Sequence, residues 1–225
     1  KQLVSIAAQR YDSFLAAIIN NGSLPINVKI LSWNYDFQFE KAYSEYTTNN
    51  SSLESLQIAL KVFPSKMNDF NYEPKNFCIY KINGTTSFKT QENEIVNPTD
   101  DIAMNSGKFM NLIPLIYDRA VNQKSLLPTL QFAWEKSSLS QKTIETAKAD
   151  IAKTEILVVI GYSFPFFNRE VDKQLLASMK PKKVYFQAPT QEVKNYPSRY
   201  LAVSGHKTEF IEIDDLSQFY LPAEL

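Results

Sequence analysis

Apolar and polar positions along the chain form two kinds of segment. Short runs rich in branched and aromatic residues are typical of strands, and longer stretches with apolar residues every three or four positions are typical of helices. The strand-like runs cover residues 28–33, 77–82, 155–163, 183–188 and 209–213. The helical pattern covers residues 1–21, 37–46, 53–62, 127–153, 168–179 and 191–203, with a break near residues 137–138.

Strands that alternate with helices predict an α/β fold: a Rossmann-like, doubly wound and mostly parallel sheet with helices on both faces. Residues 155–163 are so apolar that we expect a central strand covered on both faces. Residues 109–117 are apolar but contain a proline, which favours a wall element or an edge strand. Residues 90–107 are polar, and we expect a mobile loop there. We expect one domain over residues 1–225.

Polar residues follow three of the expected strands at the point where each strand ends. The carboxyl ends of parallel strands meet at one edge of a sheet, where open α/β folds bind ligands. We therefore expect a ligand site built from three turns. These turns contain Ser32, Asn34, Tyr35 and Asp36; then Asn83, Gly84 and Thr85; and then Gly161, Tyr162 and Ser163.

The residue types in these turns suit a ligand with hydroxyl, amide and phosphate groups. Asn34 offers a donor and an acceptor to a ribose hydroxyl or a carboxamide. Asp36 either accepts from ligand hydroxyls or caps the helix that follows it. Gly84 and Gly161 would let a ligand approach the backbone, and Ser163 can donate to a phosphate oxygen. Each turn also has a plain structural reading as a cap, a turn or a strand exit. Their occurrence together favours a site.

Composition narrows the range of partners. Lysine plus arginine and aspartate plus glutamate number 24 each, so no overall charge favours nucleic acid or an anionic membrane. Cys78 is the only cysteine, which excludes an internal disulfide and a cysteine-rich zinc site, and we expect no metal. No apolar run approaches the roughly 18 residues that a membrane span needs. We expect a cytoplasmic protein.

Three segments resemble blocks of the sirtuin-like NAD-binding domains. ILSWNYDFQFEKAY, residues 30–43, looks like a strand that ends in Thr-x-Asn-Tyr-Asp and runs into a helix. YKINGTTSF, residues 80–88, is similar to a block that normally reads Lys-Leu-His-Gly-Ser. AKTEILVVIGYSFPFFNREVDKQLL, residues 152–176, is similar to a strand that ends in Gly-Tyr-Ser-Phe-Pro. The chain resembles the bacterial sirtuin-like domains of phage-defence NAD-hydrolysing proteins more than the deacetylases.

The resemblance implies roles for single residues. Asn34 matches the family asparagine that contacts the nicotinamide ribose and helps to position water, and Asp36 matches the acidic residue of the same block. Gly161 and Ser163 match positions close to the adenosine ribose and the phosphates. The implied catalytic set is Asn34, Asp36 and Asn83. The implied nucleotide-binding set is Ser32, Tyr35, Gly84, Thr85, Gly161, Tyr162, Ser163 and Asn168.

The chain also departs from the family pattern. The family histidine that acts as general base on the ribose hydroxyls is Asn83 here, and an asparagine has no useful proton affinity near neutral pH. His206, the only histidine, matches no motif and is expected in a surface turn. The five glycines form no phosphate-binding loop, so we expect a domain without its N-terminal glycine-rich strand, turn and helix. The missing zinc cysteines argue against protein deacylation.

Three functions stay open at this point. In the first, which the resemblance implies, the chain binds NAD or ADP-ribose and, if another group supplies the base, hydrolyses NAD to nicotinamide and ADP-ribose in bacterial antiviral defence. Alternatively it is a catalytically degenerate sirtuin-like module, a pseudoenzyme that senses a nucleotide or acts as a protein–protein scaffold. The third reading is an unrelated α/β domain whose turns imitate the motifs. A partner domain or a homo-oligomer is compatible with the first two.

Overall fold

The computed structural model describes residues 2–47, 52–65, 76–90, 95–96, 113–132, 135 and 137–225. Contacts between Cα atoms divide the chain into two compact units. We name them unit 1, which holds Lys1–Pro25 and Ile144–Leu225, and unit 2, which holds Ile26–Thr143. Each unit has its own parallel sheet. The single domain expected over residues 1–225 stays a prediction.

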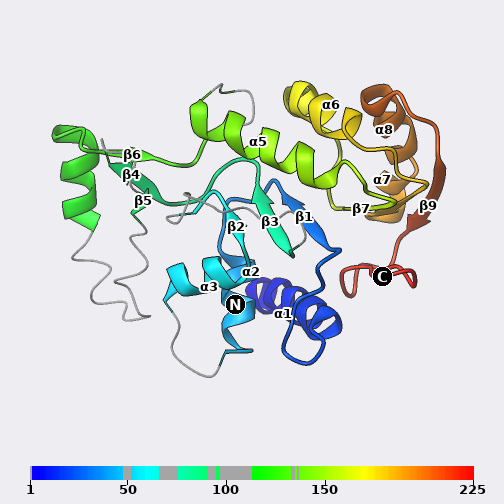
Figure 1. Ribbon diagram of the computed structural model, residues 1–225, viewed down its shortest axis with the longest axis horizontal. Coiled ribbons are helices and arrows are strands. Elements are labelled where there is room, and N and C mark those ends of the chain that lie inside the picture. The colour runs from blue at the N-terminus through cyan, green and yellow to red at the C-terminus, as the bar shows by residue number, and fades with distance from the viewer. Residues whose placement is uncertain are drawn as a thin grey trace. The chain divides into compact units, whose positions relative to one another are not determined.

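Unit 2 contains a three-stranded parallel sheet in the order β1-β3-β2. Its strands are β1 (Lys29–Ser32), β2 (Val62–Phe63) and β3 (Cys78–Lys81), and its helices α2 (Gln38–Ser44) and α3 (Leu53–Ala59) lie between β1 and β2 in the chain (Figure 1). β3 is the central strand, and all four of its residues are buried. The register pairs Ser32 with Lys81, so the carboxyl ends of β1 and β3 coincide.

The expected strands and helices of this part of the chain are confirmed, except around residue 60. The helical pattern was expected to continue to Val62, but α3 ends at Ala59 and Lys61 has a left-handed φ of 48°. Val62 and Phe63 then pair with β3 and are almost completely buried. A strand of two residues is too short to produce an alternating pattern, so Val62 was assigned to the preceding helix.

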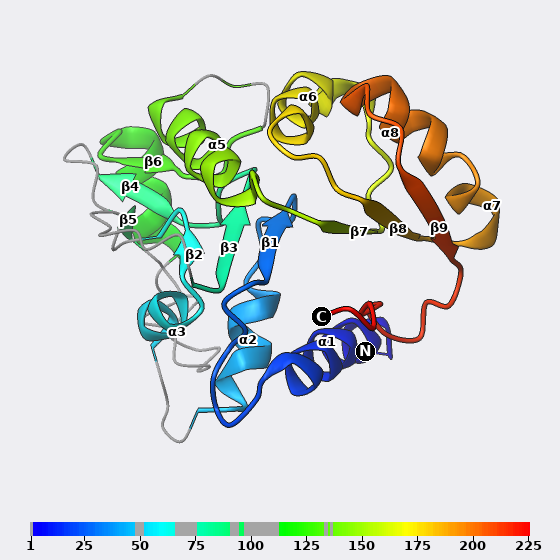
Figure 2. The same cartoon turned by 45° about the vertical axis from the view of Figure 1, so that its right-hand side comes forward.

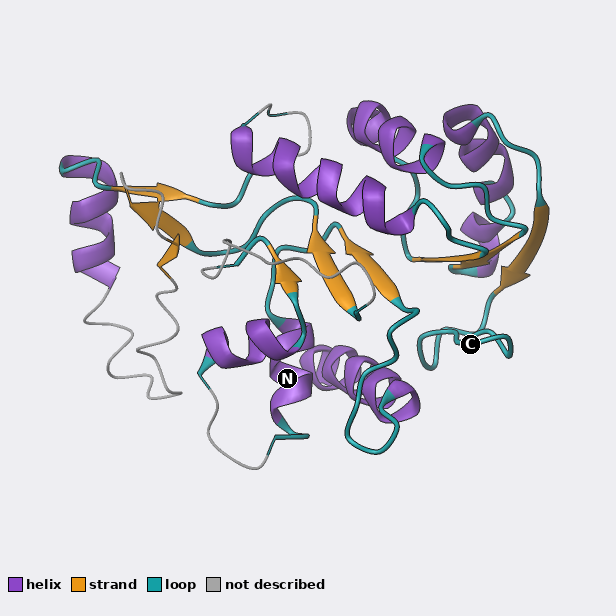
Figure 3. Ribbon diagram, in the orientation of Figure 1, coloured by secondary structure: helices purple, strands orange, loops and turns teal. Residues whose placement is uncertain are grey.

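A second, antiparallel sheet of unit 2 has the order β5-β4-β6 (Figure 3). Its strands are β4 (Phe88–Thr90), β5 (Ile95–Val96) and β6 (Leu126–Pro128). Of the two alternatives expected over residues 109–117, the edge strand is wrong for residues 113–117, which are helical and lead into the π-helical turn η1 (Asp118–Asn122). Residues 109–112, and most of the loop expected over 90–107, lie outside the described residues.

The long helix expected over residues 127–153 is only partly confirmed. α5 (Ser138–Ile151) begins at the predicted break, where the Ser137 hydroxyl accepts a hydrogen bond from the Ser140 amide at 3.1 Å. Residues 126–128 are instead the strand β6, whose Leu127 pairs with Lys89 of β4. The apolar residues of β6 fit either a helix or a strand, and pairing with β4 makes them a strand.

Unit 1 contains the parallel sheet β7-β8-β9. Its elements are α1 (Gln2–Ile18), β7 (Ile156–Ile160), η2 (Phe166–Asn168), α6 (Arg169–Ala177), β8 (Lys183–Gln187), α7 (Thr190–Val193), α8 (Tyr196–Ser204) and β9 (Glu209–Ile213). Figure 2 shows α6 and α8 on the same side of this sheet. The Tyr11 ring of α1 packs edge-on against Phe219 near the C-terminus, with centroids 5.0 Å apart, and so joins the two ends of the chain within the unit.

Two expectations for unit 1 are corrected. β7 was expected to be a central strand, but it lies at the edge of its sheet, and most of its residues are only half-buried. The central strand is β8, with four of its five residues buried, although its Lys, Tyr and Gln made it look less apolar. Residues 191–203 form two helices instead of one, because Pro197 fits only the first turn of a helix and so starts α8.

These parallel sheets with helices packed on them confirm the expected α/β class, which is Rossmann-like in character. The parallel strands lie in two three-stranded sheets, one in each unit. Among the described helices, none combines the length and the apolar character that a bilayer span requires.

The turn after β3 is packed too tightly for any side chain at Gly84. This glycine has a φ of +71°, and a Cβ atom added to it would lie 2.1 Å from the carbonyl oxygen of Thr129. The backbone amide of Gln131 donates to the Asn83 carbonyl at 3.0 Å on the same stretch. The segment after β6 therefore rests directly on the Asn83-Gly84 turn.

We predict that Gly84→Ala lowers the free energy of unfolding by at least about 2 kcal/mol, the sum of left-handed strain and a backbone clash. Gly205→Ala is the matched control, because Gly205 has a φ of +68° but no atom within 4 Å of an added Cβ. The control should lose only about 1 kcal/mol. Chemical denaturation measures both, and equal losses in the two variants would contradict the close approach of Thr129.

Candidate functional site

The predicted turns after β1 and β3 lie side by side in unit 2. Three hydrogen bonds join them beyond the end of the β-ladder, so the first two parts of the predicted edge are fixed to each other. The bonds run from the Ile82 amide to the Ser32 carbonyl (2.8 Å), from Asn83 Nδ2 to the Trp33 carbonyl (2.9 Å) and from the Thr86 amide to the Tyr35 carbonyl (3.1 Å).

The side chains of the first turn are the accessible part of this edge. Asn34 and Tyr35 are exposed, Tyr35 at 46%. The Ser32 hydroxyl accepts from the Asn34 amide at 3.2 Å and so shapes the turn. Asp36 is half-buried, and its Oδ1 accepts from the Gln38 amide at 3.3 Å. This bond supports the capping alternative for Asp36, while Asn34 and Tyr35 keep surface that a ligand could contact.

Asn83 and Thr85 of the second turn are held mainly by the protein itself. Asn83 donates through Nδ2 to the Trp33 carbonyl, but its Oδ1 is buried and has no hydrogen-bond partner in the described part of the chain. A buried amide oxygen without a donor is costly, so a water or a ligand donor would stabilise it. Thr85 is buried, with its hydroxyl 3.2 Å from that of Thr129. This contact gives Thr85 a structural role, and its ligand contact stays a prediction.

A buried ion pair, which the sequence pattern did not predict, lies behind this edge. Lys81 Nζ is 3.0 Å from each carboxylate oxygen of Glu40, and the two side chains are 1% and 0% exposed. The same ammonium donates to the Asp36 carbonyl and lies 5.1 Å from the centroid of the Phe37 ring. Two features of the sequence could have indicated this pair: the charged Lys81 ends an otherwise apolar strand, and Glu40 lies in the first turn of α2.

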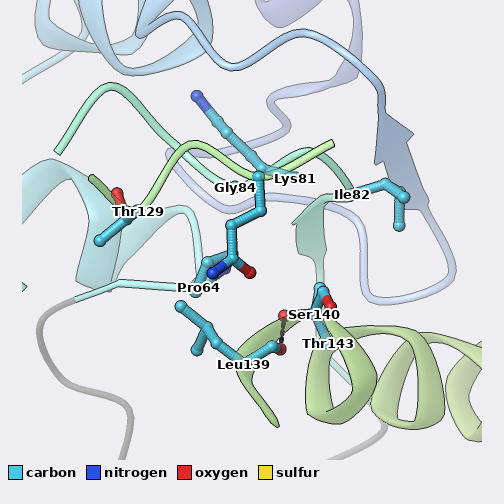
Figure 4. Close-up of a pocket in the computed structure, with 9 residues that line it drawn as sticks. Pro64, Lys81, Ile82, Gly84, Thr129, Leu139, Ser140 and Thr143 are labelled. Atoms are coloured by element: carbon cyan, nitrogen blue, oxygen red, sulfur yellow. Dashed lines mark hydrogen bonds between the residues drawn. The ribbon is translucent and has the colours of Figure 1, made fainter. Parts of the chain in front are cut away.

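The hollow on the other side of β3 has no room for a nucleotide. The space in it for a water-sized molecule is about 0 Å³, whereas ligand pockets occupy several hundred Å³. Figure 4 shows the Lys81 amine pointing away from Leu139 and Ser140, which line this hollow. A ligand at the end of β1 and β3 would therefore contact the exposed turn and not this interior space.

The third predicted turn belongs to unit 1, where its aromatic residues serve the core. Phe164 has a left-handed φ of 51°, and its ring packs edge-on against Phe186, Tyr196 and Tyr200 at 6.1–6.5 Å between centroids. Such a backbone conformation is rare for a bulky residue and persists only where packing requires it. Gly161, with a φ of +62°, is exposed on this turn, and the Ser163 carbonyl accepts from Arg199 at 3.0 Å.

Tyr162 and Asn168 belong to a buried polar cluster that also contains Asp172 of α6. The Tyr162 hydroxyl donates to the Asp172 carboxylate, with distances of 2.9 and 3.0 Å to its two oxygens, and accepts from Asn168 Nδ2 at 2.9 Å. Burial raises the pKa of Asp172 to about 7, although the hydrogen bond from Tyr162 opposes the shift. Burial and the nearby Asp172 charge also raise the pKa of Tyr162. This cluster fastens the exit of β7 to α6.

His206 lies in the turn between α8 and β9, as expected, and lines an open surface hollow of about 500 Å³ together with Lys180, Lys182 and Lys207. These lysines follow the C-termini of α6 and α8, where cations offset the partial negative charge of the helix end. In the described part of the chain, no three potential metal-binding side chains of the His, Cys, Asp or Glu type lie together.

Comparison with known proteins gives no further guide, since no protein-family model matches the chain and no curated protein matches it.

The structure brings together seven of the predicted site residues in unit 2: Ser32, Asn34, Tyr35, Asp36, Asn83, Gly84 and Thr85. Gly161, Tyr162, Ser163 and Asn168 lie in unit 1. The assignment of either group to a ligand stays a prediction.

We predict that Asp172 makes stability fall as pH rises between about 4 and 7. Its pKa is about 7 in the folded chain and about 4 when unfolded, so in this window the folded state holds a proton that unfolding releases. Asp172→Asn removes this dependence. The unfolding free energy of the wild type, minus that of the variant, should fall by up to about 1.4 kcal/mol per pH unit and level off above pH 7.

Denaturant titrations of both proteins at half-unit steps from pH 4 to 8 measure this difference. Glu209→Gln on β9 is the control, because its side chain is exposed and should leave the pH dependence of the wild type unchanged. Curves for the wild type and Asp172→Asn that run parallel over the whole range would show that Asp172 titrates normally.

Proposed function

We propose that this chain is a sirtuin-like module that binds NAD or a related nucleotide such as ADP-ribose, and that the β1/β3 edge of unit 2 contacts the ribose end of the ligand. The motif residues support the proposal: Asn34 and Asn83 follow two neighbouring parallel strands of a Rossmann-like α/β fold. In such folds the carboxyl ends of the strands are the usual place for a nucleotide.

The observation that carries the proposal is the state of the two asparagines. Asn34 is exposed. Asn83 donates through Nδ2 to the carbonyl of Trp33 in the neighbouring turn, and its buried Oδ1 has no donor among the described residues. Asn34 can both donate to and accept from a ribose hydroxyl or a carboxamide, and the Asn83 side chain holds the neighbouring turn in place. Both side chains are uncharged, which suits the neutral part of a dinucleotide.

The same residues favour binding over turnover. Hydrolysis of the nicotinamide glycosidic bond in the family uses a histidine as general base, and the amide of Asn83 cannot take up a proton near neutral pH. The only histidine of the sequence, His206, belongs to unit 1 and lies at the start of β9, opposite to the carboxyl end of that strand. We therefore expect a nucleotide sensor or scaffold, with cleavage slower by about 10²–10⁴-fold than a complete site would give.

We predict that NAD or ADP-ribose raises the melting temperature of the wild type and that Asn34→Ala abolishes the shift. A ligand that binds only the folded state stabilises it by mass action, by about 2.7 kcal/mol at a hundred times Kd. Asn34 is exposed, so the variant itself should melt within a few degrees of the wild type. Asn20→Ala, an exposed asparagine of unit 1, is the matched control and should keep the full shift.

The melting curves decide between the open functions when each sample is also analysed for nicotinamide by chromatography. A shift without nicotinamide release supports a binding module, and a shift with release supports an active glycohydrolase. If neither nucleotide shifts the wild type, or if Asn34→Ala binds as well as the wild type does, the β1/β3 edge is not the site.

We predict that Asn83→His raises NAD cleavage by at least a hundredfold, since it supplies the missing base. A histidine ring N–H can also replace the Asn83 donor to the Trp33 carbonyl, so the turn should keep its shape. Release of nicotinamide from NAD over several hours is the measurement. Asn83→Gln, which adds bulk but no proton affinity, is the control. Binding without any gain in cleavage would mean that more than the base is missing.

A further inference from the structure

We infer that Lys81 and Glu40 are positioning residues, whose buried ion pair holds the Asn34 turn against the Asn83 turn in the arrangement that a ligand would meet. The inference deepens the proposed function and rests on it, because a nucleotide site is what this arrangement would serve. Neither residue is assigned a contact with the ligand.

The contacts of the Lys81 ammonium all fall within five consecutive residues. Nζ donates to the carboxylate of Glu40, at 3.0 Å to each oxygen, and to the backbone carbonyl of Asp36, and it lies beside the Phe37 ring. An ammonium has three N–H donors, so these three acceptors satisfy it. The end of β3 is thereby tied to the residues that lead into α2 and to the first turn of that helix.

Lys81 and Asp36, whose carbonyl accepts from the Lys81 ammonium, lie close to the candidate residues in the chain. Asp36 comes two residues after Asn34, and Lys81 comes two residues before Asn83. A loss of the ion pair would release the side of the Asn34 turn that faces α2. The three hydrogen bonds between the turns would then have to hold the edge alone. The position of Asn34 relative to Asn83 therefore depends on the pair.

Stability alone is a poor reason for this pair. Two side chains that are 1% and 0% exposed lose their hydration, and apolar replacements of a buried ion pair often leave a protein as stable or make it more stable. The burial also excludes a direct role in phosphate binding for Lys81, since its charge is neutralised inside the protein. A role in fixing geometry accounts for a charged pair at this place.

We predict that the apolar double variant Lys81→Met/Glu40→Leu stays folded but loosens the edge. The Thr86 amide, which bonds to the Tyr35 carbonyl, and the Gln38 amide, which bonds to Asp36, report on the edge by hydrogen exchange. Both should exchange at least tenfold faster than in the wild type, with amides of β8 unchanged. The Kd for ADP-ribose should rise at least tenfold. The exposed pair Lys182 and Glu155, 2.9 Å apart, supplies the control Lys182→Met/Glu155→Leu, which should change neither.

The outcomes separate this inference from the proposed function. If the wild type binds ADP-ribose and the double variant binds it equally well with unchanged exchange, the pair is only structural and the inference is wrong. If the wild type binds neither ADP-ribose nor NAD, the proposed function fails, and positioning for that site fails with it, whatever the exchange rates are. If the double variant does not fold, Glu40→Asp replaces it. That variant keeps the charge but shortens the side chain by one methylene, and it should give the same two changes in smaller degree.

Discussion

A charge at the end of a completely buried strand constrains unit 2 more than any other feature. β3 lies between β1 and β2, so its last residue, Lys81, cannot reach water and must be neutralised from within. Glu40 does so from α2, which fixes the helix relative to the strand. The position of α2 in turn sets the direction in which the chain leaves β1. The exposed Asn34 and Tyr35 are therefore placed by an interaction that no ligand would touch.

The class of fold was predictable because it depends on local patterns. Apolar runs and helical periods gave β1, β3, β8, β9, α2 and α6 within a few residues, and parallel pairing followed from their alternation. Three of the errors share a cause, since each depended on a partner elsewhere in the chain. β2 is too short to show a pattern of its own and is recognised only by its pairing with β3. The apolar residues of β6 also fit a helix, and only the pairing with β4 shows that they form a strand. The edge position of β7 depends on which strands pair with it.

The candidate site was predictable in its parts but not in its construction. Strand ends and residue types indicated Asn34 and Asn83, and the parallel register does bring them together. Sequence could not show that Asp36 bonds to the Gln38 amide or that Thr85 is buried against Thr129. In unit 1 the motif residue Tyr162 bonds to the carboxylate of Asp172, and Phe164 packs into an aromatic core. A motif that resembles a nucleotide block can thus be required by packing, which is why the motif alone does not establish binding.

The support of the Asn83 turn by the segment after β6 has a consequence for how the chain could be shortened. The antiparallel sheet β5-β4-β6 looks like an insertion that could be replaced by a short linker without harm to the parallel sheet. The Thr129 carbonyl, however, fills the space that a side chain at Gly84 would need, and the Gln131 amide holds the Asn83 carbonyl. A deletion that moved Thr129 and Gln131 would remove their contacts with the Asn83-Gly84 turn. The sheet β5-β4-β6 therefore supports the candidate site from the other side of the Asn83-Gly84 turn, and a minimal version of this domain would have to retain it.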